Sequence, residues 1–250
     1  MGNSKVALVT GGGSGIGRLC AITLANAGWH VYICGRNQQS LDETISQHGQ
    51  PDTMSAVVCD VTSPESVDAL FNTITSNHSR LDFLFNNAGT NVPPMPIDEL
   101  TVEQWHSVID VNLTGAFLIA RSAFRTMRAQ DPQGGRIVNN GSVSAHVPRP
   151  GSVPYTVSKQ AINGLTRTLS LDGRPFNIAC GQIDIGNAAS AMTEAMNTGV
   201  PQADGSIKPE PTMPAQHVAD AVNSMASLPL SANVQFMTIM ASAMPYIGRG

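Results

Sequence analysis

The 250-residue chain contains only four cysteines, and no pair of them has CxxC spacing. Cys20, Cys34, Cys59 and Cys180 each lie in an apolar stretch. Disulfide scaffolds and zinc ribbons need more cysteines or different spacings, so this pattern favours buried, reduced thiols in a cytoplasmic protein. Cys34 and Cys59 lie near the ends of strands that should pair, and these two thiols could therefore be neighbours without forming a disulfide.

Metal-ligand spacings and basic patches are also missing. The six histidines form no HxxxH pair and no His/Cys cluster, so the sequence gives no reason to expect a metal. The 14 basic and 18 acidic residues are scattered along the chain and give a net charge of -4. Because no basic stripe is available to neutralise a phosphate backbone, a nucleic-acid partner is not expected.

Long apolar runs are absent as well. The chain begins MGNSKVALVTGGG and reaches glycines before a signal-peptide core could form. No segment approaches the run of about 18 apolar residues that indicates a membrane span. Export and membrane insertion are therefore not expected. The 42% of hydrophobic residues still suffices for a large core, and residues 1–250 are expected to form a single domain.

Apolar runs of strand length alternate with stretches of helical period, which predicts an α/β fold with repeated βα units around a parallel sheet. Ser63 before Pro64 is a helix-start signal. The expected strands are Lys5–Thr10, His30–Cys34, Met54–Asp60, Leu81–Asn86, Gly135–Gly141, Asn177–Gln182 and Asn233–Ala241. The expected helices are Gly15–Ala27, Gln38–His48, Pro64–Asn77, Thr101–Arg128, Val153–Ser170 and Ala215–Ser227.

Residues 186–214 fit neither period, and they are rich in Gly, Pro, Ala, Met and Thr. A long insertion of this kind in a compact domain is usually a lid or a disordered loop. It follows a strand at the carboxyl edge of the sheet, where doubly wound folds bind their ligands. The segment is therefore expected to be a substrate lid.

A glycine-rich stretch, TGGGSGIGR at residues 10–18, links the first strand to the first helix. Glycines let the backbone turn tightly and approach a pyrophosphate, while the free N–H groups and dipole of the new helix favour negative charge. The spacing is G-x3-G-x-G rather than G-x-G-x-x-G. The residues expected to border a dinucleotide are Gly11, Gly13, Ser14, Gly15, Ile16 and Gly17.

The second strand ends in Gly35 and Arg36, at the point where such folds bind the adenosine ribose. An acidic residue there would bind the 2′-hydroxyl of NAD, but Gly35 occupies that position. Arg36 offers a planar cation for a 2′-phosphate, which favours NADP(H) and leaves NAD(H) as the alternative. Asp60, beside Val61, could bind the adenine amino group or cap the helix near Pro64.

Tyr155 and Lys159 are four residues apart in an expected helix and therefore share one face. A tyrosine normally titrates near pH 10, and a nearby ammonium would lower its pKa by stabilising the phenolate. Ser142 follows an earlier strand, and its hydroxyl could hold a substrate carbonyl oxygen beside the tyrosine. Asn112 and Gly115 interrupt an otherwise strong helical pattern, which suggests function or strain.

This ordered set of motifs resembles the short-chain dehydrogenase/reductase superfamily over almost the whole chain. The matching elements are TGGGSGIG, Asp60, the segment Asn86-Asn87-Ala88-Gly89, Asn112, Ser142 and Tyr155-x3-Lys159. The resemblance implies a single Rossmann-type domain with a doubly wound parallel sheet of about seven strands and helices on both faces. Enoyl-reductase relatives have a wider Tyr-to-Lys spacing, so the chain is similar to the carbonyl/alcohol branch.

The resemblance also implies a role for each motif residue. Tyr155 would exchange a proton with the substrate, and Lys159 would lower its pKa and bind the nicotinamide ribose. Ser142 would orient the substrate oxygen, and Asn112 would hold a water in a proton relay to Lys159. The remaining cofactor contacts would be Arg36, Asp60, Val61, Asn87, Ala88, Gly89 and the main chain of Ile183.

One segment departs from the family pattern. After the sixth strand the family usually has Pro-Gly and then a threonine or serine that contacts the cofactor. Here Cys180 replaces the proline, while Ile185 occupies the threonine position. Asn187 and Asp184 are the two alternatives for that side-chain role. The departure concerns nicotinamide anchoring and not the type of reaction.

The expected substrate pocket is largely apolar, which indicates a small carbonyl or alcohol substrate. Arg149 is its one cation that could serve a single carboxylate. The expected walls are Ser144, His146, Val147, Gln182, Asn91–Met95 and Ala188–Pro201. Family members commonly form tetramers or dimers, so a homotetramer is expected. The alternatives are an NAD-linked alcohol dehydrogenase of the same family and a catalytically silent nucleotide-binding regulator.

Overall fold

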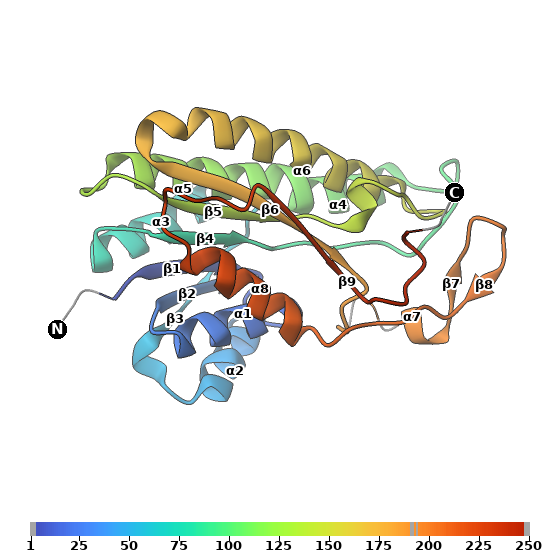
Figure 1. Ribbon diagram of the computed structural model, residues 1–250, viewed down its shortest axis with the longest axis horizontal. Helices are drawn as coiled ribbons and strands as arrows, with labels where there is room; N and C mark the ends of the chain where they lie inside the picture. The colour runs from blue at the N-terminus through green and yellow to red at the C-terminus, as the bar shows by residue number, and fades with distance from the viewer. Residues whose placement is uncertain (1–3, 191–192, 194, 248–250) are drawn as a thin grey trace.

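One parallel sheet of seven strands forms the centre of the molecule (Figure 1). The computed structural model describes residues 4–190, 193 and 195–247. The strands are β1 (Val6–Thr10), β2 (His30–Gly35), β3 (Met54–Val58), β4 (Phe83–Asn86), β5 (Gly135–Asn140), β6 (Ile178–Gly186) and β9 (Phe236–Met240). Their order is β3-β2-β1-β4-β5-β6-β9. The strand order reverses beside β1, as in a Rossmann-type sheet, and the predicted fold class is confirmed.

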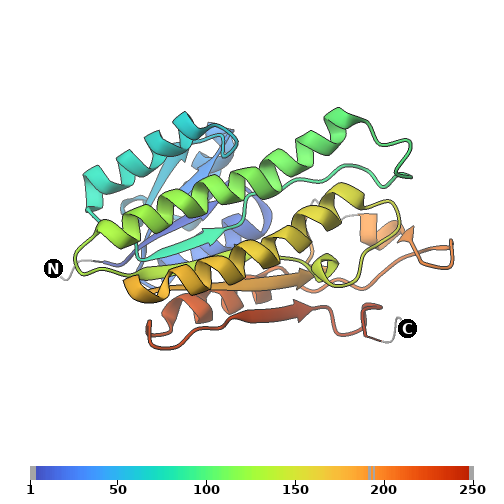
Figure 2. The ribbon, with the colours of Figure 1, turned by 90° about the horizontal axis from the view of Figure 1, so that it is seen from above.

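Helices cover both faces of the sheet (Figures 1 and 2). The helices are α1 (Gly15–Asn26), α2 (Gln38–His48), α3 (Pro64–His78), α4 (Val102–Ile109), α5 (Ala116–Ala129), α6 (Val153–Asp172), α7 (Ala195–Thr198) and α8 (Gln216–Ser227). Helices α1, α2 and α8 lie on one face, and α3, α4, α5 and α6 lie on the other. Ser63 caps α3 by accepting a hydrogen bond from the backbone of Ser66, as the sequence predicted.

The strands are apolar on both sides because each side contributes to a separate core. Along β1 all five residues are buried. Val9 belongs to the core beneath α1 and α8, together with Leu24 and Val218. Leu8 points to the opposite core, which includes Leu70 of α3 and Ile119 of α5. Continuous apolar strands are therefore a direct consequence of helices on both faces.

The segment after β6 is more ordered than its composition indicated. Strand β6 continues to Gly186, four residues beyond the Gln182 end that the pattern predicted. The following residues include α7 and an antiparallel pair, β7 (Val200–Pro201) and β8 (Ile207–Lys208). These elements lie at the carboxyl end of the sheet, at the right of Figure 1.

The helix over Val102–Ala129 contains a local irregularity at the predicted place. Residues Asp110–Gly115 form a π-helical turn between α4 and α5. A side chain at position 115 would collide with Val61, whose Cγ2 lies 2.7 Å from the place of a Cβ. By length and composition this helix could cross a membrane, but here Ile119 and Ala123 are buried in the core over the sheet.

All four cysteines are buried and free. Cys34 and Cys59 are neighbours, and a hydrogen bond between their side chains raises the pKa of Cys34 and lowers that of Cys59. Among the residues that the structure describes, no group of three or more His, Cys, Asp or Glu side chains could hold a metal ion.

Candidate active site

The glycine turn after β1 has the geometry that its sequence requires. Gly11 and Gly15 adopt positive φ angles of +68° and +50°, which side chains other than glycine rarely adopt. A Cβ at Gly17 would collide with the carbonyl oxygen of Gly11, so α1 can approach the turn this closely only with glycine there. The turn therefore leaves space at the N-terminus of α1, where backbone N–H groups can bind a phosphate.

The segment after β4 is bonded to this turn through Thr10. Its hydroxyl accepts hydrogen bonds from the backbone N–H groups of Asn87 at 2.8 Å and Ala88 at 2.9 Å. The Asn87 amide also donates to the Thr10 carbonyl and accepts a 2.8 Å hydrogen bond from Asn140, at the end of β5. These bonds align the ends of three neighbouring strands into one rim.

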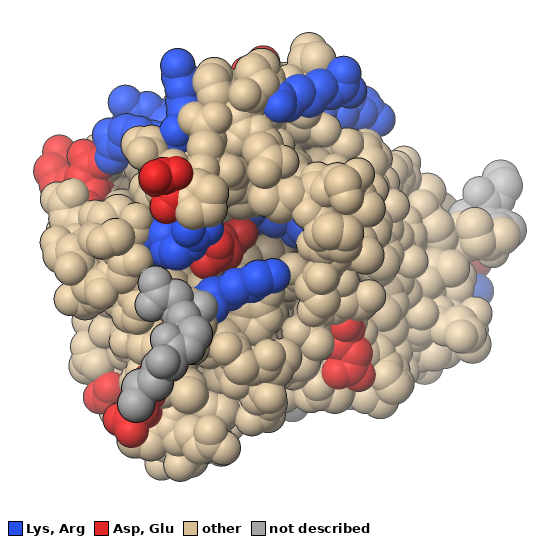
Figure 3. Space-filling model, turned by 60° about the vertical axis from the view of Figure 1, so that its left-hand side comes forward, with Lys and Arg blue, Asp and Glu red and all other residues tan. Residues whose placement is uncertain are grey.

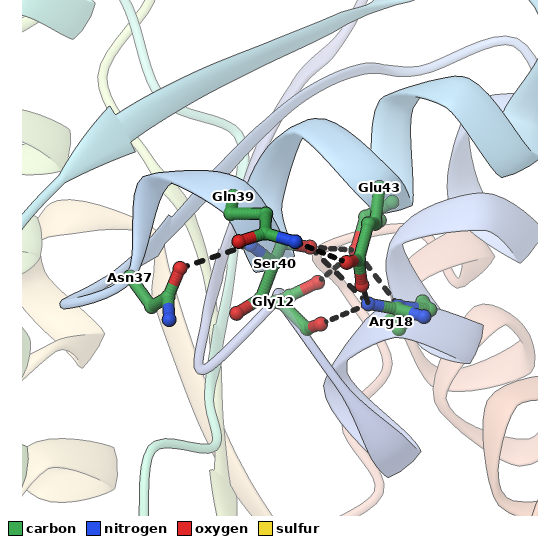
Figure 4. A network of polar contacts seen from close by, with 8 residues as sticks. Gly12, Arg18, Asn37, Gln39, Ser40 and Glu43 are labelled. Carbon is green, nitrogen blue, oxygen red and sulfur yellow. Dashed lines mark hydrogen bonds and ion pairs between the residues drawn. The ribbon is translucent and has the colours of Figure 1, made fainter.

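Arg18 of α1 and Thr44 of α2 hold the glycine turn, and Figure 4 shows Arg18 beside Gly12, Ser40 and Glu43. The Arg18 guanidinium donates to the carbonyls of Gly13 and Ser40 and forms an ion pair with Glu43 at 3.2 Å. Thr44 receives a hydrogen bond from Arg18 Nε and donates to the Gly12 carbonyl at 2.9 Å. In the sequence, the only sign of this role is the position of Arg18 directly after the glycine motif.

Replacing Arg18 by methionine is therefore expected to weaken binding of NADH and NADPH by a similar factor. The reason is that the turn loses hydrogen bonds that fix its carbonyls, each of which contributes about 0.5–1.5 kcal/mol, whereas neither ribose site changes. Titration of both nucleotides against protein fluorescence measures the two affinities. A loss confined to NADPH would show instead that Arg18 binds the 2′-phosphate directly.

Two cavities of about 270 and 280 Å³ form one groove along this rim. They share Gly11, Ser14, Ala88 and Gly89, so they meet above the glycine turn. The first cavity is lined by Gly15, Ile16, Gly17, Asn87, Tyr155, Lys159 and Ile185 among others, and the second by Gly13, Arg36, Asp60 and Val61 among others. Every predicted cofactor residue except Ile183 lies on the wall of this groove.

The exception, Ile183, has a structural role. Its side chain belongs to the core under α1 and α8, and its carbonyl accepts a 2.8 Å hydrogen bond from Gly141. Ile185, two residues later, lines the cavity instead. The contact of the Ile183 main chain with the cofactor stays a prediction.

The second cavity holds the two side chains predicted to bind adenosine. Arg36 is exposed, and among the described residues it makes no hydrogen bond or ion pair. Two hydrogen bonds from Thr62 lower the pKa of Asp60, and the Arg36 charge lowers it further. Asp60 does not cap α3, because Ser63 does so. Asp60 instead stabilises the turn at Thr62, which leaves it on the groove wall.

The first cavity brings the predicted proton-transfer residues together. Tyr155 and Lys159 line it on the same face of α6, and Lys159 Nζ lies 5.6 Å from the centre of the Tyr155 ring. A hydrogen bond connects the Tyr155 and Ser142 side chains. Lys159 Nζ also donates to the Asn140 carbonyl at 2.7 Å. The spacing of the motif therefore brings three functional groups to one place.

Burial is the largest cause of the pKa shifts of Tyr155 and Lys159. It raises the pKa of Tyr155, and the opposing effects of Ser142 and the Arg149 charge are smaller. Burial lowers the pKa of Lys159 to about 8, against an opposing effect of Asp184. The prediction of a lowered Tyr155 pKa is therefore not met in this structure. The physical reason is that burial disfavours the charged phenolate more than Ser142 and the Arg149 charge stabilise it.

Lys159 also makes stability depend on pH in a predictable direction. Its pKa is about 8 when folded, against 10.5 normally, so the unfolded chain binds more protons between these values. The cost of burying the ammonium is complete below pH 8 and is relieved as the pH rises. Relative to Lys159→Met, the wild type should gain up to about 3 kcal/mol between pH 8 and 10.5. Urea unfolding of both proteins at several pH values tests this, and a constant difference would contradict it.

Asn112 lies in the π-helical turn and is 2% exposed. Its amide accepts a hydrogen bond from the Thr90 N–H at 2.8 Å and donates to the Thr90 carbonyl at 2.9 Å. It therefore holds the loop after Gly89 against the groove. Its amide nitrogen also lies 3.3 Å from Ser158 Oγ on α6. The water relay from Asn112 to Lys159 stays a prediction.

The predicted substrate residue Gln182 is not available to a substrate. It is completely buried, and its amide bonds to Thr166, Asn163 and Asp184. Because side chains alternate along a strand, Gln182 points toward α6 and cannot reach the cavity. The prediction that it binds substrate is therefore wrong.

The other predicted substrate residues lie beside Ser142. The backbone of Ser144, which is 6% exposed, donates to Ser142 Oγ at 3.1 Å. His146 Nε2 lies 2.8 Å from the buried Asp184 carboxylate, whose other oxygen accepts from the Ser142 N–H. Asp184 therefore fixes the serine loop, a role that sequence reasoning did not assign. Contacts of Ser144 and His146 with substrate remain predictions.

Ile185 stands where the family usually has a threonine that contacts the cofactor, and neighbouring side chains could replace that threonine. Asn187 lines the first cavity, but its amide bonds to Arg149 and Glu210. Neither Asn187 nor Asp184 is thus available to replace the usual threonine. The hydroxyl residues Ser190 and Thr193 lie on the same wall and are candidates for that role.

In Figure 3, basic and acidic side chains gather around a hollow on one face of the molecule.

Comparison with known proteins agrees with this geometry. Residues 5–201 match the short chain dehydrogenase family. Sulfoacetaldehyde reductase 2 of Chromohalobacter salexigens is 30% identical over 239 residues, covering 95% of this chain and 94% of that protein. A 3-ketoacyl-(acyl-carrier-protein) reductase from Brucella melitensis, solved with NADH, has a TM-score of 0.85 at 23% identity, covering 96% of this chain and 98% of the other. An actinorhodin polyketide ketoreductase, solved with NADPH, has a TM-score of 0.83 at 25% identity, covering 94% and 95%. The chain therefore belongs to the short chain dehydrogenase family and is an oxidoreductase.

Proposed function

We propose that this protein is an NADP(H)-dependent oxidoreductase that interconverts a carbonyl group and a secondary alcohol on a small, mostly apolar molecule. The observation that carries the proposal is that Tyr155, Lys159 and the glycine turn line the same cavity. A proton-transfer group and a dinucleotide cradle would be unnecessary together in a protein that only binds nucleotides. The arrangement suits transfer of a hydride and a proton to one carbon–oxygen bond.

The groove fits a nicotinamide dinucleotide. A Cβ at Gly17 would fill the cradle against Gly11, and the second cavity ends at Arg36 and Asp60, which suit an adenosine ribose and base. The bound nicotinamide would supply or accept the hydride. The adenosine half would lie in the cavity of Arg36, and the nicotinamide half in the cavity of Tyr155.

In the proposed reaction Tyr155 donates its phenolic proton to the carbonyl oxygen during reduction and takes it back during oxidation. Ser142, bonded to the phenol, orients the substrate oxygen beside it and polarises the carbonyl. Lys159 stabilises the phenolate and binds the nicotinamide ribose. Asn112 positions the groove wall at Thr90.

The preference for NADP(H) rests on Arg36. Its guanidinium lies on the cavity wall without a partner among the described residues, while no acidic side chain occupies position 35. A planar cation suits a 2′-phosphate, and a carboxylate would suit a 2′-hydroxyl. NAD(H) is the alternative cofactor.

An uncharged substrate follows from the charges around the cavity. Lys159 is assigned to Asn140, the phenol and the nicotinamide ribose, and the Arg149 charge is balanced by Glu210 at 2.6 Å, so neither offers a free cation to an anionic substrate. The relative from Chromohalobacter is named for a sulfonated aldehyde, which makes that compound a useful contrast.

The experiment is a panel of ketones and secondary alcohols, with sulfoacetaldehyde and a keto acid included, assayed with NADPH and NADH by absorbance of the reduced cofactor. We expect turnover of uncharged, apolar ketones with NADPH. Turnover confined to the two anionic compounds would refute the proposed substrate class, and no turnover of any compound would contradict the proposed reaction.

The homotetramer also stays a prediction. The outer side of α5 and α6 carries exposed apolar side chains, including Phe117, which is 48% exposed, and Leu171, which is 59% exposed. This surface is consistent with association through these two helices.

A further inference from the structure

Glu210 lies where four separate segments of the chain meet. Its side chain is 1% exposed. One carboxylate oxygen lies 2.6 Å from Arg149 Nη2 and accepts a 2.8 Å hydrogen bond from Asn187, and the other accepts from Gln202 at 3.0 Å. Asn187 in turn accepts a 2.9 Å hydrogen bond from Arg149. The Glu210 carboxylate thus connects Asn187 after β6 and Gln202 between β7 and β8 to Arg149 in the loop before α6.

The Arg149 end of this cluster is connected to the first turn of α6. Ser152 donates to the Arg149 carbonyl at 2.7 Å and bonds to Thr156 at 2.8 Å. Tyr155 lies between these two residues in the sequence. A shift of Arg149 would therefore be transmitted to the turn that carries the phenol.

The cluster is held together by charge in a buried place. Arg149 is 16% exposed, and its Nη1 atom is buried without a hydrogen bond to any described residue. Burial raises the pKa of Glu210, but hydrogen bonds from Arg149, Asn187 and Gln202 outweigh it, so the pKa is lowered. Removing either partner leaves an uncompensated charge, which is far more disruptive than loss of an exposed pair.

We propose that Arg149 and Glu210 form a latch, which holds residues 187–190 and 195–214 closed over the cavity and balances the charge beside Tyr155. The latch rests on the proposed function, because it positions the proton donor of that reaction. Arg149 and Glu210 act through Tyr155 and are positioning residues. Arg149 and Glu210 both bond to Asn187, and Asn187 lines the cavity. The latch therefore directly contacts the cavity wall.

The second part of the latch is electrostatic. The Arg149 charge lowers the pKa of Tyr155. Glu210, 2.6 Å from Arg149, carries a charge of the opposite sign, and in the proposed latch it offsets that effect. Among the described residues, Lys159 and Arg149 act on Tyr155 directly. Asp184 on β6 acts on Lys159 and pairs with His146, while Glu210 pairs with Arg149. Only the last two are changed in the experiment.

The test is the pH dependence of alcohol oxidation in Glu210→Gln, Arg149→Met and the double variant. Oxidation needs the phenolate, so the rate rises to an alkaline plateau through the pKa of Tyr155. We expect the midpoint to shift to lower pH in Glu210→Gln and to higher pH in Arg149→Met, by on the order of half a pH unit each. The double variant should return toward the wild-type midpoint.

Hydrogen exchange of residues 187–214 provides a readout that is independent of turnover. Both single variants should exchange faster there than the wild type, while NADPH binding is retained. Lys208→Met is the matched control, because Lys208 forms an exposed pair with Asp204 in the same segment. It should change neither the midpoint nor the exchange.

Midpoints that move in the same direction in both single variants, or stay fixed, would overturn the electrostatic part of the latch. Exchange that is unchanged in both would overturn the closure. If the wild type turns over no alcohol or ketone, the proposed function fails, and the exchange experiment still decides whether the latch exists.

Discussion

Replacing Tyr155 by phenylalanine is expected to lower kcat by about 10²–10⁴-fold, the usual contribution of a positioned proton donor. Only the hydroxyl is lost, and its partner Ser142 can still hold a substrate oxygen. The ring remains over Lys159, so the cavity keeps its shape. NADPH binding should therefore be preserved, and the loss should appear in kcat.

Steady-state rates with the best ketone and a fluorescence titration with NADPH measure these two effects. Tyr246→Phe is the control, because Tyr246 packs against the core beneath α1 and α8 and does not line either cavity. Unchanged turnover in Tyr155→Phe would rule out the proposed proton transfer. Loss of NADPH binding would indicate a damaged groove.

Replacing Arg36 by leucine should weaken NADPH binding by about 10–100-fold, since a hydrogen bond to a charged group contributes about 1.5–3 kcal/mol. NADH has no 2′-phosphate, so its affinity should stay almost unchanged. Arg18→Met, by contrast, is expected to weaken NADPH and NADH binding equally. Arg36→Leu and Arg18→Met are therefore a matched pair of variants. Arg36 is exposed and caps no helix, so its removal should not affect folding.

A second variant, Gly35→Asp, tests the same site by gain of function. A Cβ at position 35 would meet only Leu41, at an ordinary 3.7 Å, so the change should be tolerated. Combined with Arg36→Leu, it should favour NADH, because a carboxylate can bind the free 2′-hydroxyl. Fluorescence titrations measure both affinities. Tighter NADH binding by the wild type would contradict the assigned role of Arg36.

Local patterns were enough to predict the fold and most of the groove. Apolar strands alternating with helical periods specify a parallel sheet covered on both faces, and the carboxyl ends of such strands converge on one edge. Gly11 and Tyr155, far apart in the sequence, therefore meet in one cavity. Asn112 was detectable because asparagine is unfavourable inside a helix.

The rest depends on information that local patterns do not contain. Gln182 is buried because its side chain points toward α6, which the strand pattern does not specify. The same pattern does not predict the last four residues of β6. Arg149 and Glu210 are 61 positions apart, and no periodicity connects them. The order in residues 187–190 and 195–214 comes from such long-range bonds, which composition cannot reveal.

The buried amide of Gln182 has a consequence for how the protein can change. Together with Asn163 and Thr166 it fixes α6 against β6 in one register, because a shifted helix would leave these polar groups unpaired in the interior. The alignment of the phenol with the strand ends is thus built into the sheet. Arg36, the residue proposed to select the cofactor, lies outside this framework, so cofactor preference can change without loss of the proton-transfer geometry.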